Sequence, residues 1–429
     1  MKVEDVVCPF CGCLCDDLVV EVENNRVTSV ENGCTLANEK LMEDHRLKNP
    51  IRRERGSWKD VSYDAAIQET AEILLDADRP LLYGWSGTHG EAQSVGVHLA
   101  ELLGAVIDNT STVCHGPSIL AIQEVGHPGC TLGQVKNRAD VIVYWGANPI
   151  DAHPRHMSRY TTYADGFFVK DAFKERKVIV IDVRKTESSA VANEFVKVDQ
   201  GGDYAVLSAL RAIVRGKGDL IPVKVAGVTR EQLFRVADIC KNAKFGAIFF
   251  GLGLTMSPGK NKNIRNAIEL TEELNRHTKF TISPMRGHWN VYGSNEVFTW
   301  ISGYPYAVDF ARGIAFYNPG ETTSVDILRR GECDACLVVA SDPGAHFPRA
   351  CAEHLARIPT VQIDPHVNAT THLATLQIPV AVTGIDAEGT AYRMDGVPIR
   401  TRKLYEGTYP SDLEILGKIY ARVKEAKGS

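Results

Sequence analysis

The chain has 429 residues, 44% of them hydrophobic and 24% charged, which is enough to bury large cores in two or three domains. Its formal charge of -5 is spread over both halves without a long basic run, so neither nucleic acid nor an anionic membrane is expected as a partner. The start, MKVEDVVCPF, has no basic and apolar leader, and apolar residues nowhere run long enough to span a bilayer. We therefore expect a cytoplasmic protein with no membrane span.

Eleven cysteines are unusual in such a chain, because the cytosol keeps thiols reduced and an odd number cannot all pair. Five of them lie near the start, and four have the spacing Cys8-x2-Cys11-x3-Cys15-x18-Cys34. A tight trio with a distant fourth thiolate predicts a [4Fe–4S] cluster, since such a loop can wrap around a cube. The alternative, a structural zinc, usually takes its ligands from two paired knuckles, and the second pair is missing. Cys13 is left as a supernumerary thiol.

The other cysteines are interpreted as structural. Cys130, Cys240 and Cys351 stand alone, which is typical of small buried hydrophobes. Cys333 and Cys336 form a CxxC pair in front of an apolar strand, with no second pair nearby.

Further along the chain, apolar runs alternate with amphipathic segments. A helix is expected within 58–75, where Ser62 or Asp64 can cap it, and another from about Asp203 to Val214. Short apolar runs that end in Gly or Asp and lead into helices indicate parallel sheets covered on both faces, and hence two doubly wound α/β units. The expected strands lie within 79–85, 105–110, 140–149, 177–184, 245–253, 336–343 and 360–366, and an amphipathic helix within 411–426 closes the chain.

Five strand-end turns carry Gly or Asp, at 146–149, 182–186, 251–255, 341–343 and 364–366. In sheets of this kind ligands bind beyond the carboxyl ends of the strands, where these residues allow close backbone approach and hydrogen bonds. An Asp that ends a strand also serves as a simple helix cap. Five such turns in two units nevertheless suggest one long ligand bound at both.

Cys114 and His115 precede a Gly-Pro pair at an expected helix start. A thiolate there is stabilised by the helix dipole and suits a soft metal, and the adjacent imidazole can transfer protons. A Cys-His dipeptide alone is often incidental. Arg286, in SPMRGHWNVYG, adds a fixed cation for a carboxylate, while Gly287 and Gly293 allow a ligand close to the backbone.

These residues together resemble the molybdopterin oxidoreductases, in particular their formate dehydrogenase branch. VCHGPS is similar to the metal-ligand motif of that branch, and MRGHWNVYG to its substrate motif. IDVRKTESSA and DQGGDYAVLSAL resemble two further family stretches, with Val183 replacing a Pro and Gly202 replacing a Thr. The cysteine head fits the iron–sulfur domain of the family, so the resemblance covers nearly the whole chain in family order.

The resemblance implies a domain plan. We expect a [4Fe–4S] domain over 1–55, a first α/β domain over 56–110 and 288–400, a second over 111–287, and a helical extension over 401–429. Formate dehydrogenases carry a further C-terminal barrel, which this chain is expected to lack.

The resemblance also implies cofactors and roles: a tungsten or molybdenum ion on Cys114 and two molybdopterin guanine dinucleotides. His115 would handle a proton and Arg286 would orient a carboxylate. Lys40 would lie between cluster and pterin or be a solvated helix lysine, and His288 would join the pocket or fix a loop. The expected dinucleotide contacts are Asn148, Asp182, Arg184, Thr186, Gly202, Asp203, Gly251, Gly253, Asp342 and Asp364.

Within that class, four stretches look like one subunit type of the formylmethanofuran dehydrogenase family, the type that carries the metal site: IFFGLGLT, PMRGHWNV, DPGAHFPR and GTAYRMDGVP. This implies reduction of CO2 to formate in methanogenesis, with three kinds of partner: a hydrolase-like subunit for methanofuran chemistry, a small barrel subunit over the pterins, and polyferredoxin subunits. Two alternatives stay open. One is a formate dehydrogenase catalytic subunit, and the other is a metal-free scaffold subunit of a formyltransferase/hydrolase complex.

Overall fold

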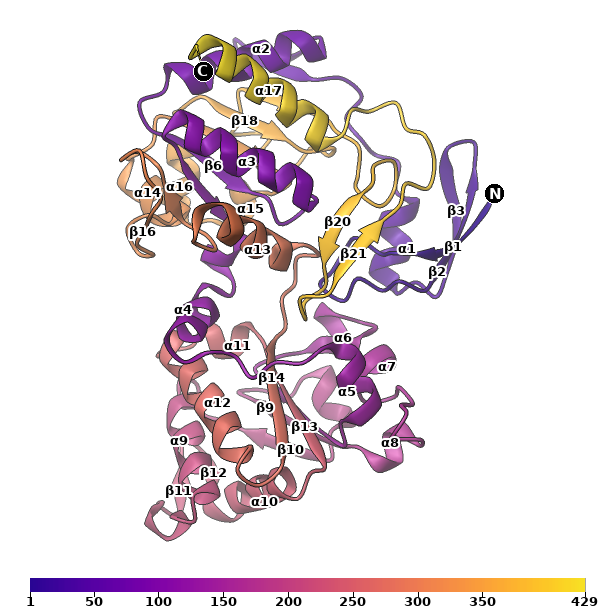
Figure 1. Cartoon of the computed structure of the whole chain (residues 1–429), viewed down its shortest axis with the longest axis vertical. Helices are drawn as coiled ribbons and strands as arrows, with labels where there is room; N and C mark the ends of the chain where they lie inside the picture. Colours follow the sequence, from indigo (N-terminus) through magenta and orange to yellow (C-terminus); the bar gives the residue numbers. More distant parts are fainter. Residues whose placement is uncertain (429) are drawn as a thin grey trace. The chain divides into compact units, whose positions relative to one another are not determined.

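The computed structural model describes residues 1–428, which fold into two compact units (Figure 1). Unit 1 comprises Met1–Val113, His288–Arg393 and the chain from Pro398 onward, and unit 2 comprises Cys114–Gly287 with Met394–Val397. The mixed α/β class expected from the sequence is confirmed. The finer division into a separate cysteine domain and a C-terminal extension stays a prediction.

Unit 1 is built on a nine-stranded sheet whose central five strands are parallel and whose outer strands are antiparallel. The central strands are almost entirely buried, which is why they read as continuous apolar runs rather than alternating ones. In pairing order the strands are β16 (Phe316–Tyr317), β15 (Val308–Asp309), β7 (Val106–Asn109), β6 (Pro80–Gly84), β17 (Ala335–Val339), β18 (Thr360–Ile363), β19 (Leu376–Ile378), β4 (Ile51–Glu54) and β5 (Ser57–Asp60).

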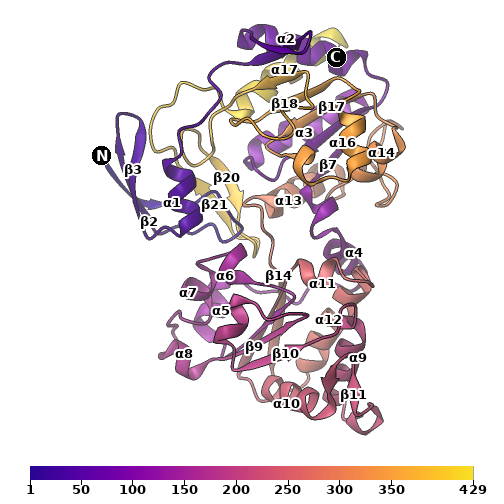
Figure 2. The ribbon, with the colours of Figure 1, turned by 180° about the vertical axis from the view of Figure 1, so that it is seen from behind.

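Helices cover both faces of this sheet, because alternate strand residues point to opposite sides. Leu82 belongs to one apolar cluster with residues of α2 (Tyr63–Asp76), α3 (Gly90–Leu103) and α17 (Asp412–Ala426). Leu81 and Tyr83 belong to another with residues of α14 (Ser324–Arg330) and α16 (Arg349–Leu355) (Figures 1 and 2). Ser62 caps α2 as expected, accepting from Ala65 N–H at 3.2 Å. The helices of unit 1 are α1 (Thr35–Met42), α2 (Tyr63–Asp76), α3 (Gly90–Leu103), η1 (Thr110–Val113), α13 (Val291–Ser302), α14 (Ser324–Arg330), α15 (Pro343–His346), α16 (Arg349–Leu355) and α17 (Asp412–Ala426).

Two small antiparallel sheets complete unit 1. The first contains β1 (Lys2–Val6), β2 (Leu18–Glu23) and β3 (Arg26–Glu31), and the loop between β1 and β2 holds four of the cysteines. The second is the hairpin of β20 (Gly389–Tyr392) and β21 (Pro398–Thr401).

Unit 2 is built on a five-stranded parallel sheet. The main apolar cluster packs one face of the sheet on four helices: α4 (Gly116–Val125), α9 (Asp203–Val214), α10 (Arg230–Lys241) and α12 (Asn261–Leu274). On the other face from this cluster, Tyr144 and Phe249 stack near His156. The sheet pairs in the order β10 (Glu194–Lys197), β9 (Lys177–Asp182), β8 (Val141–Trp145), β13 (Phe245–Phe250) and β14 (Lys279–Pro284), and a hairpin joins β11 (Lys224–Val225) to β12 (Val228–Thr229).

The predicted helix from Asp203 to Val214 is confirmed as α9, and Cys240 is buried as expected. The helices of unit 2 are α4 (Gly116–Val125), α5 (Leu132–Arg138), α6 (Pro149–Ala152), α7 (His156–Tyr160), α8 (Ala172–Glu175), η2 (Glu187–Val191), α9 (Asp203–Val214), η3 (Gly218–Leu220), α10 (Arg230–Lys241), α11 (Leu252–Thr255) and α12 (Asn261–Leu274). Within residues 1–428, no helix has the length and apolar character needed to cross a bilayer.

Strand order reverses at one point in each parallel sheet, between β8 and β13 in unit 2 and between β6 and β17 in unit 1. Such switch points open crevices at the carboxyl ends of the strands. Glycines line the crevice in unit 2: a Cβ on Gly253 would lie 2.7 Å from the Cα of Gly146, and one on Gly251 would lie 2.5 Å from the carbonyl oxygen of Gly146. The two strand-end turns therefore approach each other backbone to backbone.

Candidate functional site

Three predicted catalytic residues come together at the carboxyl edge of the unit 2 sheet. Cys114 and His115 precede α4, and Arg286 lies two residues after β14. The Arg286 cation acts electrostatically on both Cys114 and His115, although 170 residues of chain separate it from them.

Cys114 is partly exposed, and its carbonyl oxygen accepts a hydrogen bond from Thr255 Oγ1 at 3.3 Å. Burial raises the pKa of the Cys114 thiol to about 11, and the Arg286 cation and the N–H groups of Gly287 and His115 only partly offset it. The helix-start stabilisation expected from the sequence is therefore outweighed by desolvation. A bound metal ion would supply the missing positive charge and favour the thiolate.

His115 is fully enclosed, with both ring nitrogens in hydrogen bonds. Its Nδ1 lies 3.0 Å from Ser118 Oγ, and its Nε2 lies 3.1 Å from the carbonyl oxygen of Met285, so Nε2 carries the proton in this arrangement. Burial, with a smaller effect of Arg286, lowers the pKa of His115 to about 3. The imidazole is thus neutral near pH 7, and any proton it takes up is readily passed on.

Two further buried histidines that the sequence analysis missed lie behind this group. His153 Nε2 donates to the carbonyl oxygen of Arg286 at 2.9 Å, and His156 Nδ1 lies 3.1 Å from the Tyr144 hydroxyl. Beside the larger effect of burial, His153 contributes to the lowered pKa of both His115 and His156. Their position in DAHPRHM, directly after a strand-end turn, was the available signal.

Most of the predicted dinucleotide contacts in unit 2 lie at the same sheet edge. Asn148 Oδ1 accepts from Ser188 Oγ at 2.6 Å, and Asp182 Oδ1 accepts from the N–H of Arg184 at 3.3 Å. Thr186 caps η2 by accepting from Ser189 N–H at 3.3 Å. These bonds hold the turns after β8 and β9 in shape, while the Arg184 side chain is exposed at the edge.

Gly202 and Asp203 start α9, and Asp203 carries a partnerless atom. Asp203 is 5% exposed; its Oδ1 accepts from the indole N–H of Trp145 at 2.9 Å, whereas its Oδ2 is buried without a hydrogen-bond partner. A Cβ on Gly202 would lie 2.3 Å from Ala226 Cβ, which explains the glycine there. Asp203 Oδ2 can therefore accept a hydrogen bond from an N–H group of a ligand at this sheet edge.

In unit 1, Asp342 and Asp364 follow β17 and β18. Asp342 Oδ1 accepts from the N–H and hydroxyl of Thr370 at 2.8 and 2.7 Å, so it fixes a loop. Burial raises the pKa of Asp364 to about 7. Asp364 lines a cavity of about 290 Å³ at the switch point of this sheet, together with Gly87, Ala340, Phe10, Lys40 and His288.

The four predicted cluster ligands gather within unit 1. Burial raises the pKa of Cys8 well above its usual value, and the thiols of Cys11, Cys15 and Cys34 add to that rise, so all four lie within electrostatic reach. No disulfide joins any cysteine of the described chain. The loop is fixed by the Cys8 N–H, which donates to the Cys15 carbonyl at 2.8 Å. Thiols that oppose each other's ionisation fit a site completed by iron, because iron neutralises the thiolates.

Cys13 and Lys40 lie beside this cluster. A hydrogen bond from Cys13 lowers the pKa of Cys11, and the Lys40 ammonium lowers it further. Lys40 Nζ lies 5.6 Å from the centre of the Phe10 ring and lines the 290 Å³ cavity, although the side chain is also exposed. Lys40 thus lies within electrostatic reach of Cys11 and also lines the cavity, and its place between cluster and pterin stays a prediction. No three His, Cys, Asp or Glu side chains of residues 1–428 are grouped to hold a single metal ion.

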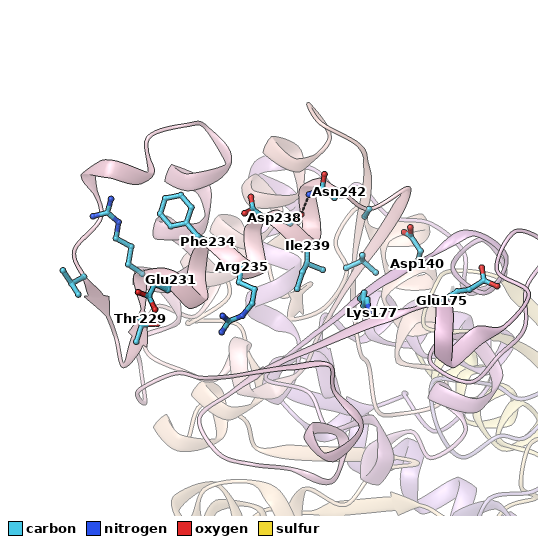
Figure 3. A pocket seen from close by; sticks show the side chains of 14 residues that line it. Asp140, Glu175, Lys177, Thr229, Glu231, Phe234, Arg235, Asp238, Ile239 and Asn242 are labelled. Carbon is cyan, nitrogen blue, oxygen red and sulfur yellow. Dashed lines mark hydrogen bonds between the residues drawn. The ribbon is translucent and has the colours of Figure 1, made fainter.

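A cleft of about 1140 Å³ in unit 2 lies away from these residues. It runs from Thr229 and Glu231 past Phe234 to Asp140 and Glu175 (Figure 3). Val141 and Lys177 are the first residues of β8 and β9, so this cleft lies at the amino ends of the strands, away from the edge that holds Cys114 and Arg286.

Comparisons with known proteins agree with this architecture. Residues 46–280 match the model of the molybdopterin oxidoreductase family. Two solved structures share the fold: acetylene hydratase from Pelobacter acetylenicus (TM-score 0.74, 14% identity, 99% of this chain and 70% of that chain) and a chain of the formyltransferase/hydrolase complex from Methylorubrum extorquens (TM-score 0.71, 23% identity, 89% and 100%). The fold and the matched segment define a molybdopterin oxidoreductase.

Two curated relatives narrow the class. Both are the B subunits of a tungsten-containing formylmethanofuran dehydrogenase 2: the chain is 52% identical to that of Methanocaldococcus jannaschii and 49% identical to that of Methanococcus maripaludis, in each case over 99% of both chains. Formate dehydrogenase H of Escherichia coli is 24% identical over 71% of this chain and 49% of its own. The chain therefore belongs to the B-subunit family of formylmethanofuran dehydrogenase, a family of oxidoreductases.

Proposed function

We propose that the chain is the catalytic subunit that reduces CO2 to formate within a formylmethanofuran dehydrogenase complex. The observation that carries the proposal is the convergence of Cys114, His115 and Arg286 at one edge of the unit 2 sheet. A soft ligand, a neutral imidazole and a buried cation are the groups that a carboxylate-forming reduction needs.

The reaction consumes CO2, two electrons and one proton and yields formate, so the site must manage charge on the carboxylate and deliver the proton. A tungsten or molybdenum ion held by Cys114 and two pterin guanine dinucleotides supplies the two-electron chemistry when bound. Arg286, only 5% exposed, faces the forming carboxylate with a fixed planar fork and stabilises its growing negative charge. His115 supplies a nitrogen for proton transfer, with Ser118 as its hydrogen-bonding neighbour.

Cys8, Cys11, Cys15 and Cys34 would hold a [4Fe–4S] cluster, which would supply one-electron transfer to the subunit. Lys40, within electrostatic reach of Cys11 and lining the unit 1 cavity, supports a path from cluster to pterin. Within unit 2, the vacant Asp203 oxygen suits the N–H donors of a guanine base, and the glycine-lined switch point suits a phosphate or pterin edge.

The proposed partners are those of the family plan: a hydrolase-like subunit that condenses formate with methanofuran, ferredoxin-like electron carriers and a small barrel subunit over the pterins. The rival interpretation as a metal-free scaffold leaves the gathered thiols of Cys8, Cys11, Cys15 and Cys34 without a metal to bind, and no disulfide joins them. The other rival, a formate dehydrogenase, differs in its partners rather than in this site.

The test is purification of the complex through a tag on this chain, followed by analysis of metals, pterin and formate oxidation with a viologen dye. We expect about four irons and one tungsten or molybdenum per chain, with dye reduction that depends on formate. A metal-free complex would refute the proposal in favour of the scaffold. Co-purification without any methanofuran-specific subunit would favour a formate dehydrogenase.

A further inference from the structure

Unit 2 exposes an unusual number of aromatic rings in one short segment, residues 163–173, here named the aromatic loop. Tyr163, Phe167, Phe168 and Phe173 are 45%, 68%, 58% and 48% exposed, and every exposed phenylalanine of residues 1–428 lies here. Four half-exposed rings leave roughly 400 Å² of aromatic surface in water. Apolar surface of that size on a folded protein typically marks a contact with another macromolecule.

The rings are held in pairs rather than scattered. Tyr163 and Phe173 stack with centroids 5.4 Å apart, and Phe167 meets Phe168 edge to face at 5.0 Å. The residues between them point inward: Ala164 and Val169 are 5% and 3% exposed. The loop therefore has a buried side that anchors it and an aromatic side that it displays.

Backbone hydrogen bonds fix the loop on the end of α5. The N–H of Phe168 donates to the Asn137 carbonyl and the N–H of Phe167 to Asn137 Oδ1, both at 2.9 Å. Gly166 N–H closes a turn on the Val169 carbonyl at 2.7 Å. A Cβ on Gly166 would lie 2.0 Å from the Lys136 carbonyl oxygen, so the close approach needs glycine.

A buried arginine holds the aromatic loop in position through hydrogen bonds to backbone carbonyls. Arg176, 1% exposed, donates from Nε to the Ala139 carbonyl at 2.9 Å and from Nη2 to the Lys136 carbonyl at 2.7 Å. Its Nη1 donates to the carbonyls of Thr161 and Ala164. The guanidinium thus joins the end of α5 to the start of the aromatic loop. Because the rings are already ordered, a partner that covers them loses little conformational entropy.

The charge around the rings is positive. Arg138 lies 4.7 Å over the Phe168 ring and Lys170 lies 5.0 Å over the Phe167 ring. Neither cation forms an ion pair in the described part of the chain, nor do the exposed Lys136 and Lys177 nearby. The acidic groups are already engaged: Asp165 and Glu175 accept from backbone N–H groups and Asp171 pairs with Lys174.

We propose that the aromatic loop is the docking surface for another subunit of the complex, one that presents an apolar pocket rimmed by carboxylates. Preformed aromatic rings flanked by unpaired cations are the composition of interface hot spots, and the cations select an acidic partner over a basic one. The inference rests on the proposed function only in requiring that the chain works within a complex.

The test replaces the rings within the whole complex. The double variant Phe167→Ser/Phe168→Ser is expressed with the partner subunits, and subunit stoichiometry is measured after purification through a tag on this chain. We expect one other subunit to bind at least about thirtyfold more weakly, because hot-spot rings contribute that much. The matched control is Leu220→Ser/Val223→Ser, which removes side chains that are 80% and 79% exposed elsewhere in unit 2 and should change no stoichiometry.

A second variant, Arg138→Glu/Lys170→Glu, tests the charge of the partner. It should weaken the same subunit's binding, and the effect should shrink as salt is raised. A photo-crosslinking residue at Tyr163 should label that subunit. Full stoichiometry in both variants, or a crosslink to a second copy of this chain, would overturn the proposal. Stoichiometry is independent of turnover, so a wild-type complex without formate chemistry would contradict the proposed function and leave this result intact.

Discussion

The indole N–H of Trp145, the last residue of β8, donates to Asp203 Oδ1 at 2.9 Å, and this bond ties the end of a strand to the first residue of α9. Both side chains are buried, and the second carboxylate oxygen has no hydrogen-bond partner. The bond also orients that oxygen, since a carboxylate held at one oxygen cannot turn freely. A buried acceptor in this state costs free energy until a donor reaches it.

We predict that Asp203→Asn loses part of the bound dinucleotide. The amide still accepts from Trp145 through its oxygen, but it places an NH2 group where the vacant acceptor stood, so a donor on the ligand meets a donor. Guanine dinucleotide per chain should fall at least about tenfold at limiting cofactor, which corresponds to one lost hydrogen bond to a charged group. Unchanged cofactor content would remove Asp203 from the binding site.

Cys114→Ala should abolish formate oxidation with a viologen dye while the iron content stays near four per chain. The thiol is the only proposed protein ligand of the tungsten or molybdenum ion, and the cluster cysteines belong to unit 1 rather than unit 2. Metal analysis and dye reduction on the same preparation give the answer. Retained activity would contradict the assignment of Cys114.

For the cluster, Cys34→Ala and Cys13→Ala form a matched pair. Cys34 caps α1 and is the distant fourth ligand, so its loss should remove the cluster and its absorbance. Cys13 is fully buried and shares a hydrogen bond with Cys11, so its loss should leave iron in place. Iron retained in Cys34→Ala would mean that Cys13 has substituted or that the ligand set is different.

Arg286→Lys keeps the positive charge but loses the planar fork that matches a carboxylate. We expect a loss of about 2–3 kcal/mol of transition-state stabilisation, or roughly a hundredfold in the rate of CO2 reduction. Rates measured under saturating CO2, with tungsten content checked, separate this effect from cofactor loss. An unaffected rate would move Arg286 out of the reaction.

Acid should destabilise unit 2 through His156. Burial lowers the pKa of His156 to about 3, against about 6.5 in an unfolded chain, so the unfolded state binds the extra proton. The stabilisation is complete above pH 6.5 and is lost progressively as pH falls toward 3. His156→Asn keeps a group that can bond Tyr144 at the Nδ1 position and removes the titration. Its unfolding midpoint should depend less on pH in this window, by a difference on the order of a few kcal/mol in stability; parallel curves for both proteins would contradict the prediction.

Particular elements show which parts of the fold could be predicted from the sequence. The helices α2 and α9 and the strands β6, β8 and β13 follow from local pattern, because a buried parallel strand is a short apolar run and an amphipathic helix repeats its apolar face. The spacing of Cys8, Cys11 and Cys15 and the motif around Cys114 are likewise local. The sequence therefore predicted these elements and motifs at the positions where they occur.

The tertiary structure decided what depends on distant segments. Whether burial or the helix start governs the pKa of the Cys114 thiol depends on the tertiary packing around it, and burial prevails. His153 meets Arg286 because a strand-end turn brings its ring to the Arg286 carbonyl, and the aromatic loop is displayed because Arg176 holds carbonyls from two segments. Electrostatic interactions and desolvation act through space. A sequence pattern can therefore identify candidate residues, but it cannot show which of them lie close together in the buried interior.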